Sequence, residues 1–167
     1  MKESFPNSPD KPLVKVALVE DKPAVRDSWT QLINALPGFS LAISCASAEE
    51  ALRVIPEMHP DIVLMDIFLP RMSGIECTAK LKELLPKAQI LILTAVEDDE
   101  LVFMALQAGA DGYLLKRTKP EDLRMAMVDV LSGGAPMTSE IARRVVESFR
   151  KAKSATKSDI RLSAREE

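Results

Sequence analysis

The sequence contains few of the residues that build metal centres or covalent cross-links. It has a single histidine and two cysteines, and Cys45 and Cys77 stand far apart. This spacing indicates neither a disulfide framework nor a zinc site, so we expect both cysteines to be small buried hydrophobic residues. His59 lies beside Pro60 in a loop before an apolar run, and we assign it no chemistry.

Long apolar runs and aromatic residues are also scarce. No apolar run approaches the roughly 20 residues that a membrane-spanning helix needs, and no signal peptide opens the chain. Aromatic residues make up 4% of the sequence, and we expect its one tryptophan, Trp29, to serve in packing. These absences predict a cytoplasmic protein with no membrane partner.

What the sequence does contain is typical of a globular protein. Its 167 residues are 47% hydrophobic and 28% charged, which suits one domain with extensions. The net charge of −3 hides an asymmetry, because residues 1–134 are net acidic and residues 135–167 are net basic. An acidic body with a basic tail is compatible with a regulatory domain that leads into a nucleic-acid-binding module.

One short stretch organises the rest of the chain. Between Asp61 and Asp66 stand four consecutive apolar residues. A run this short, bounded by Pro60 and Pro70, predicts a strand buried on both faces, as in parallel sheets covered by helices. Ligand sites in such sheets lie outside the carboxyl ends of the strands, so Asp66 should stand at the rim where a ligand binds.

Strand and helix patterns alternate along the domain. Apolar runs predict strands at residues 14–19, 41–46, 61–66, 89–94 and 112–115. A helix-start signal follows each strand, at Pro23, Ser47, Ser73, Glu97 and Thr118. Strict alternation of five strands with five helices predicts an α/β fold, a doubly wound five-stranded parallel sheet with right-handed crossovers.

The two ends of the chain differ from this domain. Residues 1–12 hold three prolines and little to bury, which predicts a disordered arm before a domain at residues 13–134. Thr138 to Lys153 predicts a separate amphipathic helix with Ile141, Val145 and Phe149 as its apolar positions. Residues 154–159 predict a polar linker, so we expect residues 135–161 to form a linker helix and a linker.

Each predicted strand except the second ends on a polar residue. These strand ends carry Glu20 and Asp21, Asp66, Thr94, and Lys116. Three carboxylates at one rim would repel each other unless a cation joined them, and Mg²⁺ prefers such oxygen ligands. Acidic residues also favour strand ends and helix caps for structural reasons, which explains Asp21 alone far better than it explains the whole set.

Together these positions resemble the receiver domain of two-component response regulators over residues 13–134. The resemblance rests on four pieces, which are residues 20–21, residues 66–70 with Gly74, residues 94–95, and residues 113–116. It implies a flavodoxin-like sheet with strand order 2-1-3-4-5.

The resemblance also implies a chemistry for the rim. Asp66 resembles the phosphoacceptor, which takes a phosphoryl group from the histidine of a sensor kinase or from a small phosphodonor. Glu20, Asp21, Asp66 and the main-chain carbonyl of Phe68 would hold Mg²⁺. Lys116 would neutralise charge on the equatorial phosphoryl oxygens.

Three further residues match positions that read the phosphoryl group. Thr94 would donate its hydroxyl to the bound group, and the small Ala95 would leave room for it. Tyr113 matches the aromatic switch position, which would follow Thr94 inward on phosphorylation and alter the outer face of the fourth and fifth helices.

Two positions depart from the pattern of many receivers. Arg117 follows Lys116 where many receivers have a proline after a cis bond, so we expect no cis peptide here. Phe68 and Val96 stand two positions beyond Asp66 and Thr94, and neither side chain can orient an attacking water. This predicts slow spontaneous loss of the phosphoryl group.

The tail resembles the linker of NarL/LuxR-type regulators. Leu162 to Glu166 resembles the opening of a helix-turn-helix domain, so residues 162–167 are expected to begin a DNA-binding domain that is truncated in this sequence. The full protein would then be a transcription factor. This chain alone should not bind a specific DNA site, because the reading helix is absent.

Leu101 to Leu106 is a run of six apolar residues. A helix on a sheet needs only one apolar stripe, so Val102, Phe103 and Leu106 cannot all face inward. We expect an exposed patch that serves homodimerisation on phosphorylation or partner docking, with broad burial as the alternative.

Two other functions compete with a phosphorylation-dependent transcription regulator. A phosphatase of the aspartyl-phosphate type would need a second acid at the position of Phe68, so we expect no substrate turnover. A stand-alone receiver that acts by protein–protein contact fits the domain as well. It is distinguished by whether the native gene continues past Glu167 into a helix-turn-helix.

Overall fold

The computed structural model describes residues 12–96 and 98–165, and the side chains of residues 12–96 and 98–153. The predicted disordered arm therefore lies outside the described residues, apart from Pro12. The strands are β1 (Val14–Val19), β2 (Phe39–Cys45), β3 (Ile62–Met65), β4 (Gln89–Thr94) and β5 (Gly112–Leu115). The helices are α1 (Pro23–Ala35), α2 (Ala48–Met58), α3 (Gly74–Leu84), α4 (Asp99–Gln107), α5 (Pro120–Leu131) and α6 (Ser139–Arg165).

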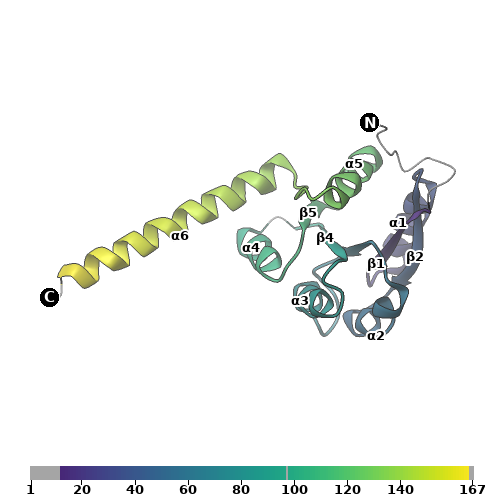
Figure 1. The fold of residues 1–167 in the computed structure, drawn as a ribbon, viewed down its shortest axis with the longest axis horizontal. Helices are drawn as coiled ribbons and strands as arrows, with labels where there is room; N and C mark the ends of the chain where they lie inside the picture. Colours follow the sequence, from purple (N-terminus) through teal and green to yellow (C-terminus); the bar gives the residue numbers. More distant parts are fainter. Residues whose placement is uncertain (1–11, 97, 166–167) are drawn as a thin grey trace.

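The strands form one parallel sheet in the order β2-β1-β3-β4-β5. Strand residues alternate between two cores, because successive side chains of a strand point to opposite faces. Val63 and Ile92 pack with α2, α3 and α4 on one face, whereas Leu64 and Leu93 pack with α1 and α5 on the other. Figure 1 shows these helices flanking the sheet. The predicted fold class and strand order are confirmed.

The parallel register gathers the strand ends at one rim. Val19 pairs with Met65, and Met65 pairs with Ile92. Thr94 pairs with Leu115 on the last strand. The residues that follow these ends leave the sheet together, which is where a doubly wound fold binds its ligand.

Gly74 fixes the loop that follows β3. A Cβ atom at this position would overlap the main-chain oxygen of Asp66, which belongs to rigid backbone and cannot move aside cheaply. The amide of Gly74 also donates to the Ile67 oxygen at 2.9 Å. Only glycine lets α3 begin this close to the Asp66 backbone.

The segment before α6 runs along the open edge of β5. The Tyr113 amide donates to the Pro136 oxygen at 3.1 Å, and Tyr113 and Met137 form a parallel bridge. A Cβ atom at Gly112 would lie 2.6 Å from the same oxygen, so this close approach depends on glycine. The linker thus shields an edge that would otherwise expose unpaired backbone groups.

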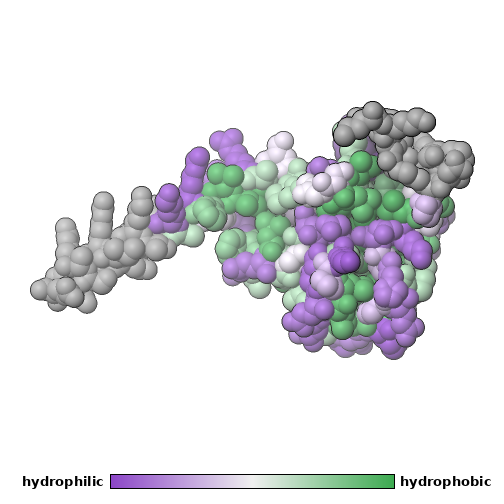
Figure 2. Space-filling model, viewed as in Figure 1, coloured by the Kyte–Doolittle hydropathy of each residue, from purple (hydrophilic) through white to green (hydrophobic). Residues whose placement is uncertain are grey.

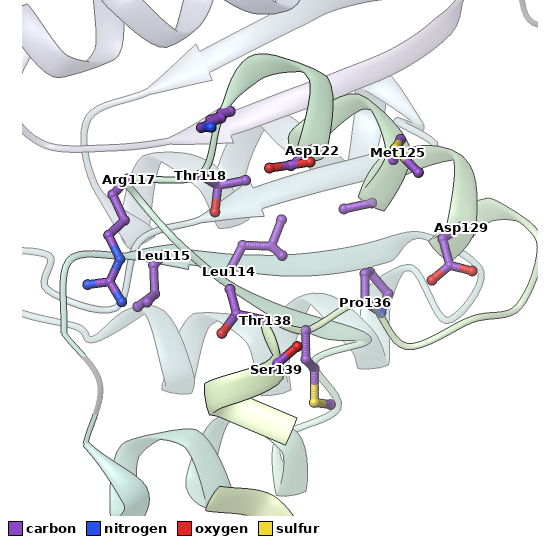
Figure 3. A pocket seen from close by; sticks show the side chains of 13 residues that line it. Leu114, Leu115, Arg117, Thr118, Asp122, Met125, Asp129, Pro136, Thr138 and Ser139 are labelled. Atoms are coloured by element: carbon purple, nitrogen blue, oxygen red, sulfur yellow. The ribbon is translucent and has the colours of Figure 1, made fainter. Parts of the chain in front are cut away.

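A pocket of about 570 Å³ separates this linker from α5. Figure 3 shows Pro136, Thr138 and Ser139 facing Asp122 and Asp129 of α5 across it. None of the acidic residues at the rim lines this pocket. The linker therefore contacts the β5 edge and the α4 side of the domain and stands clear of most of α5.

Helix α6 is docked only at its beginning. Ile141 is fully buried in the same core as Tyr113, and Val145 packs partly against that core. Of the three predicted apolar positions, Phe149 is 70% exposed, because α6 has already left the domain there (Figure 1). The linker predicted at residues 154–159 is wrong, since the helix continues to Arg165. That stretch contains neither proline nor glycine, and alanine and lysine favour helix.

The apolar run in α4 is buried on two sides. Val102 is 1% exposed, so its predicted place in an exposed patch is wrong. Leu106 is partly buried against the core, and only Phe103, at 39%, is exposed as predicted. The run is long because α4 packs against both the sheet and α6.

Two strand bounds differ slightly from the prediction, since β2 covers residues 39–45 and β3 residues 62–65. The expected burial of both cysteines and of Trp29 is confirmed. Cys45 and Cys77 are buried, and burial raises the pKa of each thiol to about 12. Trp29 is buried in the core beneath α1. The described residues contain no cis peptide bond, as Arg117 in place of proline predicts. No helix among them is long and apolar enough to cross a membrane.

We predict that Ile141→Ala lowers the free energy of unfolding by about 2–4 kcal/mol, because it leaves a cavity where α6 docks on the core. Val146→Ala is the matched control, since Val146 is 49% exposed on the same helix and its loss should change stability by less than about 0.5 kcal/mol. Urea denaturation followed by circular dichroism measures both. Equal losses in the two variants would mean that α6 is not docked through Ile141.

Candidate functional site

An ion pair between a lysine and two buried carboxylates lies at the rim. The Lys116 ammonium lies 2.8 Å from Glu20 Oε2 and 2.9 Å from Asp66 Oδ2. Glu20 is 1% exposed and Asp66 is 5% exposed, so neither carboxylate has ready access to bulk water. These three residues directly follow β1, β3 and β5 and are far apart in sequence. They converge at the rim, as the order of the strand ends predicts.

Asp21 completes an acidic cluster. Oxygen atoms of Glu20, Asp21 and Asp66 all lie within 4.8 Å of one another. Asp21 Oδ1 is buried, and the described residues offer it no hydrogen-bond partner. Buried polar atoms normally have a partner, so this oxygen fits a hard cation such as Mg²⁺.

The charges at the rim shift two pKa values. Burial raises the pKa of the Glu20 carboxyl, and the Lys116 ammonium opposes part of this shift. Burial disfavours the charged form of Lys116 as well, but its hydrogen bonds to Glu20 and Asp66 outweigh that effect, so the pKa of Lys116 is raised. The lysine thus stays charged and supplies a fixed positive charge at the site.

Thr94 lies at the end of β4 beside Lys116. The Lys116 amide donates to the Thr94 oxygen at 2.8 Å. The Thr94 hydroxyl is buried, and no hydrogen-bond partner exists for it among the residues that the structure describes. Ala95 follows as a small, exposed residue. A buried hydroxyl with an unused donor can serve an incoming oxygen-rich group.

Tyr113 is buried inside the domain. Its side chain is 0% exposed, and its hydroxyl donates to the Val96 oxygen at 3.0 Å. That bond links β5 to the segment between β4 and α4. Tyr113 thereby contacts the Thr94 side of the rim through its side chain and the α6 linker through its amide.

The loop that carries Phe68 is held by a residue that the sequence reasoning missed. Glu49 on α2 accepts a hydrogen bond from the Met72 amide at 3.2 Å and lies 3.5 Å from Arg71 Nε. Arg71 has a left-handed backbone, with φ of 65°. The Phe68 amide lies 3.4 Å from Asp66 Oδ1, and its side chain is 51% exposed. No sequence signal connects Glu49 to this loop, because the contact spans 23 residues.

A second missed residue is Arg26 on α1. Its Nη1 donates to the Glu20 oxygen at 2.9 Å and to the Asp21 oxygen at 3.4 Å. A signal was available in the sequence, because a cation near a helix N-terminus is unfavourable unless something compensates.

Comparison with known proteins identifies the domain. The family model for the response regulator receiver domain matches residues 16–128. The chain belongs to this family. Its relatives are regulators of the NarL/LuxR type, as NarL itself and a LuxR-family crystal structure indicate.

The transcriptional regulatory protein YxjL of Bacillus subtilis is 35% identical over 142 residues, which are 84% of this chain and 65% of that protein. The nitrate/nitrite response regulator NarL of Escherichia coli K12 is 30% identical over 152 residues, which are 90% of this chain and 70% of NarL. A crystal structure of a LuxR-family two-component response regulator from Aurantimonas sp. SI85-9A1 has 36% identity and a TM-score of 0.77, covering 83% of this chain and 99% of that one. The chain spans about two thirds of the curated relatives it matches.

We predict that Lys116→Met makes the receiver more dependent on Mg²⁺ for stability. Without the ammonium, the buried Glu20 and Asp66 carboxylates repel each other, and a bound cation should relieve that repulsion. The rise in melting temperature on adding Mg²⁺ should therefore be larger in the variant than in the wild type.

Lys82→Met is the control for this experiment. Lys82 lies 2.6 Å from Asp111 in a similarly shielded ion pair outside the acidic cluster. Its loss should lower stability but leave the Mg²⁺-induced shift unchanged. Equal shifts in all three proteins would contradict the role given to Lys116.

Proposed function

We propose that this receiver is phosphorylated on Asp66 by a sensor histidine kinase, and that it controls transcription through a DNA-binding domain outside this sequence. The observation that supports the proposal best is the Lys116 ammonium bridging Asp66 and Glu20 at 2.9 and 2.8 Å, beside Asp21. The names of the relatives, which are transcriptional and response regulators, point the same way. A cytoplasmic location stays a prediction.

The chemistry is an in-line transfer to a carboxylate. An oxygen of Asp66 attacks phosphorus, forming an acyl phosphate as the bond from phosphorus to the donor breaks. The leaving group is the imidazole of the kinase histidine, or acetate when acetyl phosphate is the donor. Lys116 neutralises a phosphoryl oxygen, and the Thr94 hydroxyl donates to another.

Glu20, Asp21, Asp66 and the Phe68 carbonyl would hold Mg²⁺ at this rim. Bound there, the cation offsets the negative charge that collects on the phosphoryl oxygens. The chain's own contribution is to fix these ligands, through the parallel strands beneath Glu20 and Asp66 and through the Gly74 contact that places the following loop.

The switch we propose runs from Thr94 to Tyr113. A phosphoryl group on Asp66 draws the unused Thr94 hydroxyl toward it, which stabilises the inward position of Tyr113. Tyr113 also donates its amide hydrogen to the linker, so the position of Tyr113 and the docking of α6 are energetically coupled. A change at Asp66 thereby alters how firmly α6 is held.

Two ion pairs fasten α6 near the switch. Arg117, directly after Lys116, lies 3.0 Å from Glu140, and Arg144 lies 2.8 Å from Asp99 of α4. Exposed pairs of this kind contribute about 0–1 kcal/mol each. They therefore set the orientation of the helix, while the burial of Ile141 supplies most of the docking energy.

We predict that incubation with Mg²⁺ and acetyl phosphate adds one phosphoryl group to the wild type and none to Asp66→Asn. Asp61→Asn is the control, because Asp61 is an exposed carboxylate at the other end of β3 and should not affect the reaction. Intact-protein mass spectrometry measures the product.

After the donor is removed, the same samples report the lifetime of the acyl phosphate. Phe68 and Val96 place exposed apolar side chains near the site, and neither can activate water. Decay should take many minutes or longer. Phosphorylation of the Asp66→Asn variant would refute Asp66 as the acceptor. Decay of the acyl phosphate within seconds would refute the predicted slow loss of the phosphoryl group.

We also propose that the receiver forms a homodimer when phosphorylated. Phe103 and Met104 expose apolar side chains on α4, and Val146 and Phe149 expose theirs on α6. Figure 2 shows hydrophobic surface gathered over α4 and the near part of α6. A patch of this kind is typical of an association surface.

We predict that Phe103→Asp weakens self-association of the phosphorylated protein by about tenfold or more, since it places a charge in an apolar contact. Met125→Asp is the control, because Met125 is an exposed apolar residue on α5, at 59% against 39% for Phe103. Sedimentation velocity with beryllofluoride measures the effect. Wild-type association of Phe103→Asp would exclude α4 from the interface.

A further inference from the structure

Arg26 places a positive charge near the N-terminal end of α1, where the helix dipole disfavours it. Lys22 is the N-cap residue and Arg26 lies one turn later, while no acidic residue stands in the first turn. The N-terminal end of a helix carries a partial positive charge, so cations there are unfavourable. Lys22 is exposed to water, whereas Arg26 is partly buried and needs a partner.

Arg26 finds its partners in the main chain of the two residues that begin the acidic cluster. Its Nη1 donates to the oxygens of both Glu20 and Asp21. The guanidinium thus bonds to the backbone and leaves the carboxylates to other partners. Lys116 takes one Glu20 oxygen, and Asp21 Oδ1 keeps no partner among the described residues.

We propose that Arg26 is a positioning residue for the divalent cation, a proposal that rests on the proposed function. By tying the Glu20 and Asp21 carbonyls to α1, Arg26 fixes the turn between β1 and α1. The Asp21 carboxylate is thereby held within reach of Glu20 and Asp66, although it lies beyond the last residue that the sheet fixes.

Two effects of this guanidinium on a bound cation have opposite signs. As a nearby positive charge it repels Mg²⁺, so its removal should tighten binding if charge alone mattered. As a clamp on the ligand-bearing turn it preorganises the site, so its removal should weaken binding. The sign of the change therefore separates positioning from simple electrostatics.

Three variants of the chain give this comparison. Arg26→Met removes both the charge and the clamp, and Lys22→Met removes a charge close by while leaving the clamp intact. Arg26→Lys keeps the charge but replaces the planar, multi-donor guanidinium with a single ammonium. Mg²⁺ affinity is measured by isothermal titration calorimetry at fixed ionic strength, without a phosphodonor.

We expect Arg26→Met to bind Mg²⁺ about tenfold more weakly, at the low end of the effect of residues that orient metal ligands. Lys22→Met should bind as tightly as the wild type or more tightly, and Arg26→Lys should fall between. The rate of phosphorylation by acetyl phosphate should return to within about twofold of the wild-type rate at saturating Mg²⁺, because the reacting groups are intact.

Each result has a definite meaning. If Arg26→Met binds Mg²⁺ as tightly as Lys22→Met, the positioning role is refuted while the proposed function stands. If the wild type itself binds no Mg²⁺, the proposed function fails and this inference fails with it. Should Arg26→Met not fold, as circular dichroism without Mg²⁺ would show, Arg26→Lys decides the question, since unchanged affinity there means that the clamp is not required.

Discussion

The attraction between one ammonium and two buried carboxylates is the constraint on which the rest of this domain depends. Charges removed from water are tolerated only when they are paired and hydrogen-bonded. Lys116 meets this need for Glu20 and Asp66, and in doing so joins the ends of β1, β3 and β5. The same contact holds the sheet rim together and supplies the positive charge that the proposed phosphoryl transfer needs, so the stability of the rim and its proposed chemistry have a common origin.

Strand β5 connects this rim to the outside of the domain. Lys116 follows it at one end, and Tyr113, three residues earlier, binds the linker through its amide and the β4–α4 segment through its hydroxyl. Because these hydrogen bonds join β5 to both neighbouring segments, a shift at one end of this short strand should also move the other end. Packed elements of this kind shift between discrete arrangements, which is how a local change of charge is converted into a change in a distant helix.

Much of this architecture could be predicted from the sequence. Apolar runs that end on polar residues identify parallel strands and their rim, because burial on both faces and the single polarity of the sheet leave few alternatives. The convergence of Glu20, Asp66 and Lys116 was therefore predictable, whereas side-chain contacts that do not follow from strand order were not. Val102 was expected at the surface because nothing in the sequence reveals that α6 covers α4. The position of Arg26 near a helix N-terminus indicates that it needs a partner, but the sequence does not identify that partner, because the oxygens it binds belong to the backbone.

The length of helix α6 determines the direction in which its far end points. Its 27 residues form one continuous helix, and among residues 139–153, whose side chains are described, the contacts reported above lie between Glu140 and Val145. The part beyond Val145, residues 146–165, spans about 30 Å at about 1.5 Å per residue, and each residue turns the helix by about 100°. Removing a single residue from the free part would swing the far end by more than a quarter turn, whereas removing seven would nearly restore its heading. The number of residues in α6 therefore fixes the direction in which its last turn faces relative to the domain.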